Sequence, residues 1–169
     1  TIRTELEFLR ACLNHHLGKG QSQIWLPPAS APRDRFLTRE ELDKLLASIE
    51  TPHVRLFVIL AITTGARMTA ILDLTWDRVH LNRPTPTVDF QPAGRHVTNK
   101  RRTEVPLNSR ALVALREAKA AALTTHVIEY AGQPIASIRK GIERAAARAR
   151  VPCSPHVFRH TAGVWMAQA

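Results

Sequence analysis

The sequence has few cysteines and no long apolar run, and these absences exclude several classes of protein. Its two cysteines, Cys12 and Cys153, belong to no CxxC pair and to no Cys/His metal-ligand pattern. Neither a disulfide scaffold nor a zinc site is indicated, and the cysteine usage is typical of a reducing compartment. No stretch approaches the roughly 18–20 apolar residues of a membrane span, and the first residues lack the shape of a signal peptide. We therefore expect no metal, no other cofactor and no membrane partner.

Lysine is also scarce, although the chain is strongly basic. Nineteen of the 24 basic residues are arginines, and 14 acidic residues leave a net charge of +10. The planar guanidinium fork of arginine matches phosphate oxygens two at a time, so a polyanionic partner is the first hypothesis. The alternative is that the charge serves only solubility. With 44% hydrophobic and 22% charged residues, the chain can bury a core and is not a disordered basic tail.

The N-terminal part of the sequence predicts a separate unit. Leucines recur at three- and four-residue spacing over residues 3–17, which predicts an amphipathic helix. Three prolines over residues 21–36 then predict an extended linker. The chain has no starting Met and ends in a helical pattern without a cap. We expect it to be an interior piece of a longer protein.

Beyond the linker, capping signals divide the sequence into short helices. Thr38 and Glu41 form a capping box, in which each side chain satisfies a free amide at a helix start. Residues 54–62 are apolar apart from one arginine, which predicts a helix buried on most sides. This helix is expected to begin near Pro52 and to end at Gly65.

The remaining elements follow from similar local patterns. We expect a short helix at 68–73, a strand at 85–90, a β-hairpin whose strands 95–98 and 103–107 flank the turn 99–102, and helices at 109–122 and 137–150. Ser154 is an N-cap, and Pro155 at the first helical position starts a last helix. The expected fold class is mainly α with a small antiparallel β-sheet (α+β).

Two cations stand at positions where chemistry is possible. Arg67 follows a glycine turn between two apolar helices, where a buried positive charge needs an anion. It is equally consistent with an arginine that caps the preceding helix. Lys100 is the only lysine expected on a β-turn, and its neighbours Arg101 and Arg102 would lower its pKa toward that of a proton donor. The alternative is a solvated charged tip.

The last helix carries a third candidate. Arg159 and His160 follow His156 by three and four residues, so both share a helix face with it. An imidazole beside a guanidinium suits a phosphate held while a proton moves. His156 and His160 also have the spacing of a metal site, but no HExxH glutamate and no third ligand lies nearby in the sequence.

A basic stripe is expected on the helix at 137–150. Lys140, Arg144 and Arg148 recur every four residues, with apolar side chains on the opposite face. Each cation could contact one phosphate, and together they would make binding fall steeply with salt. An ordinary solvated face has the same pattern.

Taken in order, these elements resemble the catalytic domain of the tyrosine recombinase (phage integrase) family. The likeness spans residues 36–169 and depends on three motifs: Thr64-Gly-Ala-Arg67 with Leu74 and Trp76, Lys100 followed by Val105, Pro106 and Leu107, and His156, Arg159, His160 and Thr161. Residues 1–20 resemble the last helix of the family's preceding core-binding (SAM-like) DNA-binding domain. Residues 21–36 are then the linker, and 37–169 are a catalytic domain incomplete at its C-terminus.

The resemblance implies site-specific DNA recombination or integration by a metal-free transesterification. Arg67 and Arg159 would clamp the non-bridging oxygens of a DNA phosphodiester. His156 would assist the proton of the nucleophile, and Lys100 would protonate the departing 5′ oxygen. The product would be a 3′-phosphotyrosyl enzyme.

The sequence departs from the family pattern at several places, one of which is a short hairpin that puts Lys100 nearer Pro106 than in many members. Ala70 stands where the family usually has an acidic residue, so support for Arg67 must come from elsewhere. The only tyrosine, Tyr130, precedes the last motif and is out of family order. We therefore expect the nucleophilic tyrosine to lie beyond this chain, and residues 1–169 alone not to cleave DNA.

The expected partner is double-stranded DNA, with a homo-tetramer of the full-length protein acting on it in the cytoplasm, associated with the nucleoid of a bacterium or with a phage. The residues expected to contact DNA outside the catalytic set are Arg101, Arg102, Lys140, Arg144, Arg148 and His160. Two other functions stay open. One is a non-catalytic, architectural DNA-binding protein, and the other is a metal-dependent hydrolase that uses His156 and His160.

Overall fold

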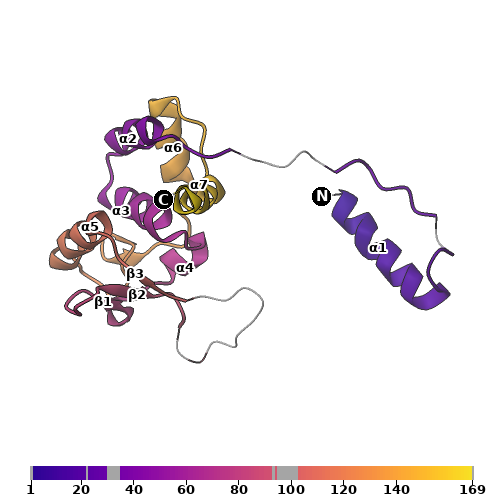
Figure 1. The fold of residues 1–169 in the computed structure, drawn as a ribbon, viewed down its shortest axis with the longest axis horizontal. Coiled ribbons are helices and arrows are strands. Elements are labelled where there is room, and N and C mark those ends of the chain that lie inside the picture. The colour runs from indigo at the N-terminus through magenta and orange to yellow at the C-terminus, as the bar shows by residue number, and fades with distance from the viewer. Residues whose placement is uncertain (1, 22, 30–34, 93, 95–102, 169) are drawn as a thin grey trace. The chain divides into compact units, whose positions relative to one another are not determined.

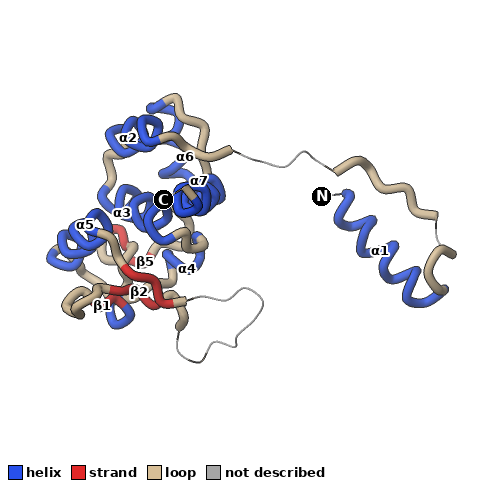
Figure 2. The backbone as a smooth tube through the Cα atoms, in the orientation of Figure 1, coloured by secondary structure: helices blue, strands red, loops and turns tan. Residues whose placement is uncertain are grey.

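The fold is mainly helical, with two small antiparallel sheets (Figures 1 and 2). The computed structural model describes residues 2–21, 23–29, 35–92, 94 and 103–168. In chain order the elements are α1 (Ile2–Leu17), α2 (Arg39–Ser48), α3 (Pro52–Thr64), α4 (Met68–Leu72), the 3-10 helix η1 (Trp76–Arg78), β1 (Val79–His80), β2 (Thr87–Asp89), β3 (Glu104–Pro106), α5 (Ser109–Ala120), β4 (Glu129–Tyr130), β5 (Gln133–Pro134), α6 (Arg139–Ala149) and α7 (Pro155–Ala167). The expected fold class is confirmed.

The chain divides into two compact units, Thr1–Asp34 and Arg35–Ala169. In the first unit, α1 is the amphipathic helix predicted from the leucine spacing. None of its residues is fully buried, and Arg3 donates a hydrogen bond to the carbonyl of Pro27 in the segment that follows. In the described part of the chain, no helix is both long enough and apolar enough to cross a membrane.

The second unit is built around α3 (Figure 1). Pro52 occupies the first turn of this helix, and every residue from Val54 to Ile62 is buried except the arginine between them. Gly65 ends the helix in the left-handed conformation, with φ 62°. Other residues are strained at such a positive φ, which explains the glycine. The predicted start, burial and end of this helix are confirmed.

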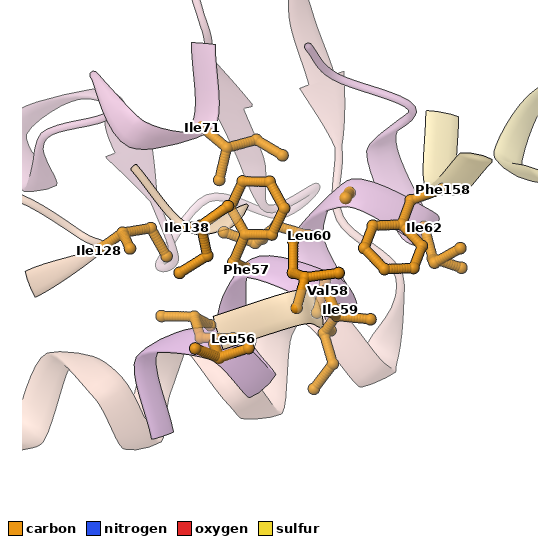
Figure 3. Close-up of a cluster of buried hydrophobic side chains, with 14 of the residues drawn as sticks. Leu56, Phe57, Val58, Ile59, Leu60, Ile62, Ile71, Ile128, Ile138 and Phe158 are labelled. Carbon is orange, nitrogen blue, oxygen red and sulfur yellow. The ribbon is translucent and has the colours of Figure 1, made fainter. Parts of the chain in front are cut away.

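A single hydrophobic core surrounds α3 (Figure 3). Its side chains cluster with Ile71 of α4, with Ile128 and Ile138 from the loops, and with Phe158 of α7, all of which are almost completely buried. Burying side chains of this size stabilises the fold by about 1.5–3 kcal/mol each. Because α3 contacts α4 and α7, it positions two of the elements that form the cleft described below.

The predicted capping signals operate at the helix starts. Thr38 accepts a hydrogen bond from the amide of Glu41, and the Glu41 carboxylate accepts one from the amide of Thr38, so the capping box of α2 is complete. Arg35 also pairs with Glu41, at 2.6 Å. The Ser154 side chain caps α7, with Pro155 in the first turn.

The described sheet contains the strand predicted at 85–90, as β2, in a pairing that the sequence did not predict. Strand β3 forms where residues 103–107 were expected to be extended, but its described partner is β2, with Val105 opposite Val88. The expected partner, residues 95–98, and the turn with Lys100, Arg101 and Arg102 lie outside the described residues. The two-residue strands β1, β4 and β5 were not predicted, because a strand that short carries no alternating pattern.

Helix α6 has the two faces that its sequence predicts. Ile138 just before it and Ile142 within it are buried, and the Lys140, Arg144 and Arg148 side chains are exposed. Gly141 lies against the Val54 side chain of α3. A Cβ added there would come within 2.6 Å of Val54 Cγ2.

The Gly141→Ala variant should therefore be destabilised by about 1–3 kcal/mol, although alanine favours a helix more than glycine does. The β-branched Val54 side chain has little freedom to rotate away. The control is Gly163→Ala in α7, where no heavy atom lies within 4 Å of the added Cβ. This control should gain up to about 1 kcal/mol. Denaturant unfolding of both variants checks the prediction, and equal shifts of one sign would contradict it.

The capping box predicts an acid-sensitive contribution to stability. The hydrogen bond from Arg35 and the backbone amide of Thr38 hold the pKa of Glu41 below its ordinary value. A carboxyl with a lowered pKa stabilises the fold above its unfolded-state pKa, and this contribution is lost as pH falls. Glu41→Gln should therefore cost stability at pH 7 and progressively less at pH values below the ordinary carboxyl pKa of about 4.3. Unfolding free energies measured over this pH range, beside an exposed Glu117→Gln control, check the prediction; a cost that persists in acid would contradict it.

Candidate active site

A cleft of about 710 Å³ opens on the second unit where the end of α3, the start of α4, strand β3 and helix α7 meet. It brings together three of the four predicted catalytic residues, Arg67, His156 and Arg159. His160 also lines it. The lining residues come from segments about 90 positions apart in the sequence, so the folded core sets their geometry.

Arg67 reaches the cleft because of the turn at Gly65. The glycine ends α3, and two residues later Arg67 is the N-cap residue of α4, with its carbonyl accepting bonds from the amides of Ala70 (2.9 Å) and Ile71 (3.1 Å). Its side chain is half-buried. Ala70, at the position of the family's acidic residue, is 2% exposed and also lines the cleft.

Arg159 is tied to the same turn. Its guanidinium Nη1 donates a hydrogen bond to the carbonyl oxygen of Gly65, at the C-terminal end of α3. Burial lowers the pKa of Arg159, and the nearby charge of Arg67 lowers it further. No carboxylate in the described ranges forms an ion pair with Arg159. Arg67 thus lies close enough to disfavour the charge of Arg159, and such a pair of guanidiniums forms a site that favours an anion.

The histidines come from the N-terminal half of α7. His156 is exposed and His160 is half-buried, on the helix face that lines the cleft. The described residues contain no group of three or more His, Cys, Asp or Glu side chains placed to hold a metal ion. The face shared by His156, Arg159 and His160 is the one that their spacing predicted.

The fourth predicted catalytic residue, Lys100, cannot be placed, because residues 95–102 lie outside those described. The strands on either side of this segment both reach the cleft. Phe90 follows β2 directly, and Thr103 and Val105 belong to the β3 side, and all three line the cleft.

The basic stripe on α6 is a surface distinct from the cleft. None of its three cations is among the cleft-lining residues. Arg148 forms an ion pair with Glu50 at 2.9 Å, and no ion pair or hydrogen bond of the Lys140 or Arg144 side chain is found in the described part of the chain. The stripe therefore presents two cations with no carboxylate partner there and one that is partly neutralised.

Tyr130, the only tyrosine, lies away from the cleft. It is in β4, where its ring makes an edge contact with His53 at 5.1 Å between ring centroids. It lines a separate groove of about 410 Å³ formed by the start of α3, α5 and β4.

Two contacts around the cleft were not predicted from the sequence. The Gly65 carbonyl is one, and a backbone group carries no sequence signal for the side chain that will bind it. Thr161 is the other. It is fully buried, and its position three residues after Phe158, on the core face of α7, was the available signal.

Comparison with known proteins places the fold and the family. A profile of the phage integrase family matches residues 35–169. A comparison with curated proteins found no match. Among solved structures, a Tn1549 transposon integrase in complex with circular intermediate DNA is similar over 99% of this chain and 67% of its own, at 15% identity and a TM-score of 0.79. A lambda integrase tetramer bound to a Holliday junction is similar over 96% and 52%, at 17% identity and a TM-score of 0.71.

The XerH site-specific recombinase bound to difH substrate is similar over 98% of this chain and 53% of its own, at 18% identity and a TM-score of 0.66. The chain thus spans about half the length of XerH and of the lambda integrase. At these identities the likeness shows the fold. The family match covers most of the chain, including all the described cleft residues. The chain belongs to the phage integrase family.

Proposed function

We propose that this chain is part of a site-specific DNA recombinase that breaks and rejoins DNA by transesterification through a 3′-phosphotyrosyl intermediate. The observation that best supports this function is the cleft shared by Arg67, His156 and Arg159. Two guanidiniums and an imidazole in one cleft match what a phosphodiester needs while it exchanges one oxygen for another. The family match over residues 35–169 points the same way.

In the proposed reaction, Arg67 and Arg159 hold the two non-bridging oxygens of the scissile phosphate. Negative charge on these oxygens increases as the tyrosine oxygen attacks phosphorus, so fixed guanidiniums stabilise the transition state more than the ground state. The hydrogen bond to the Gly65 carbonyl fixes the direction of Arg159 before DNA arrives. Because the charge of Arg67 disfavours that of Arg159, a phosphate between them removes a repulsion as well as forming bonds.

The protons are assigned to His156 and Lys100. His156 accepts the proton of the attacking hydroxyl, and Lys100 gives a proton to the 5′ oxygen as its bond to phosphorus breaks. Thr103 lines the cleft and is three residues from Lys100, a distance of at most about 10 Å along an extended chain.

The proposed nucleophile is a tyrosine outside residues 1–169. Tyr130 is the only tyrosine of the chain, and it contacts His53 beside a different groove. For the rest of the chain, we propose that residues 1–20 are the last helix of a core-binding domain, 21–36 a linker and 37–169 the incomplete catalytic domain. Exposed apolar side chains on α1, including Ile2, Phe8 and Leu9, support this assignment, since such a face is normally covered.

The proposed partner is double-stranded DNA, on which the full-length protein acts as a homo-tetramer in the cytoplasm, at the nucleoid. Lys140, Arg144 and Arg148 on α6, together with Arg101, Arg102 and His160, would contact DNA phosphates outside the reacting one. The exposure of the three α6 side chains supports this role for α6. The place of His160 in the cleft supports it for that residue. Phosphate contacts of this kind position the protein without reading sequence.

Removal of either clamp should abolish chemistry without abolishing binding. In the protein that includes the nucleophile, Arg67→Ala and Arg159→Ala should each lower formation of the covalent protein–DNA adduct by about a hundredfold or more. Duplex affinity should change little, because most of it comes from other phosphate contacts. A nicked suicide substrate and denaturing gels measure the adduct. The control is Arg116→Ala, an exposed arginine on α5.

Unaltered cleavage in either variant would remove the clamp roles. An adduct formed by residues 1–169 alone, and lost in Tyr130→Phe, would overturn the assignment of the nucleophile. A full-length protein that binds DNA but never forms an adduct would favour the architectural alternative.

The α6 stripe should determine how binding depends on salt. Lys140→Ala and Arg144→Ala should each reduce the slope of log K against log salt concentration by about one. Arg148→Ala should have a smaller effect, because Glu50 already pairs with Arg148 at 2.9 Å. Fluorescence anisotropy of the 169-residue chain with a labelled duplex measures the slopes. Slopes equal to that of the unaltered chain would exclude this face from the DNA interface.

A further inference from the structure

The hydroxyl of Thr161 joins two parts of the second unit that are far apart in the sequence. Among the described residues it belongs to the only polar side chain that is fully buried. Its oxygen accepts a hydrogen bond from the backbone amide of Leu37 at 2.9 Å and donates one to the carbonyl of Val157 at 2.7 Å. Burial removes this hydroxyl from water. Loss of either hydrogen bond would therefore leave a buried polar group without a partner, which costs free energy.

Leu37 belongs to the segment through which the chain enters the second unit, residues 35–38, which we call the leading segment. Its side chain is fully buried. Arg35, two residues earlier, contacts the carbonyl of Pro152 at 3.5 Å and the Glu41 carboxylate at 2.6 Å. The leading segment is thus attached both to α2 and to the residues just before and within α7.

Helix α7, which carries Thr161, lines the cleft with its opposite face. Thr161, Phe158 and Ala162 face the core, whereas His156 and Arg159 line the cleft. Thr161 and Arg159 are two residues apart, so they point to opposite sides of the helix. The hydrogen bond from the Leu37 amide is therefore made on the core side of α7, within one turn of the residues assigned to the scissile phosphate.

We propose that Thr161 is a positioning residue, which couples the leading segment to the cleft by fixing how far α7 stands from the turn at Gly65. This inference rests on the proposed recombinase function. The Gly65 carbonyl accepts a hydrogen bond from the Arg159 guanidinium. A Cβ added at Gly65 would lie 3.5 Å from the Cβ of Ala162 in α7. A small shift of α7 therefore changes the position of Arg159 relative to Arg67.

The test replaces the hydroxyl by a methyl group of the same shape. Thr161→Val removes the acceptor for the Leu37 amide, and Thr161→Ser keeps it. The matched control is Thr63→Val in α3, because the Thr63 hydroxyl also bonds the carbonyl four residues before it, that of Ile59 at 2.8 Å, but has no partner of the Leu37 kind among the described residues.

The first readout is hydrogen exchange of the Leu37 amide in the 169-residue chain. The amide should exchange much faster in Thr161→Val than in the unaltered chain, and Thr161→Ser should restore its protection. Thr63→Val should leave it unchanged. A Leu37 amide that stays protected in Thr161→Val would overturn the proposed contact, whatever the activity of the protein.

The second readout is the rate of adduct formation at saturating DNA in the protein that includes the nucleophile, well below its unfolding temperature. We expect Thr161→Val to lower this rate by about tenfold to a hundredfold, which is the usual effect of a displacement near 1 Å. The Kd for duplex should stay within about twofold. Thr161→Ser should regain most of the rate, and Thr63→Val should match the unaltered protein.

Equal rates in Thr161→Val and the unaltered protein would overturn the positioning role alone. A parallel loss of rate and of DNA affinity, not rescued by serine, would show a general structural defect and would also overturn it. If the unaltered protein forms no adduct, the proposed function fails instead, so the two failures are distinguishable.

Discussion

The burial of α3 is the constraint on which the rest of the second unit depends. A helix that is apolar on nearly all sides is stable only when other elements cover every face, and α4, α5 and α7 all pack on it. Protein interiors are packed at the density of organic crystals, so the side chains between α3 and each covering helix set the distance between the two. The cleft forms where this cover is incomplete, beyond the last turn of α3. Its position is therefore a consequence of where the apolar run ends.

The end of α3 also makes a strongly cationic site tolerable. Arg159 stands beside Arg67, and both burial and this neighbour disfavour its charge. The carbonyl groups at a helix C-terminus carry a partial negative charge, and Arg159 donates to one of them, that of Gly65. This contact offsets part of the cost for Arg159, which forms no ion pair with a carboxylate among the described residues. A carboxylate would offset more, but it would also compete with an incoming phosphate. The buried Ala70 leaves the family's acidic position without one.

Helix limits were predictable from the sequence because their signals are local. Thr38 with Glu41, Pro52 with Gly65, and Ser154 with Pro155 each mark a boundary by chemistry within a few residues. The pairing of β3 was not predictable in this way, since its partner β2 is separated from it by the long connection that contains Lys100. The cleft was predicted only through the order of three motifs. Its internal contacts depend on backbone carbonyls and on the buried Thr161, whose neighbours follow from the packing of whole helices.

The cleft shows how a site can be rigid although its parts are distant in sequence. Arg67 follows directly from α3, while His156 and Arg159 belong to a helix whose opposite face is locked in the core. Neither wall can move without disturbing buried packing, so the backbone positions of the two arginines are set before any ligand binds. The repulsion between them is then part of the cost of the fold. A phosphate bound between them, as proposed above, would remove that cost, and anion binding would then be linked to the stability of the second unit. Such an arrangement is better explained by recognition of an anion than by stability of the free protein.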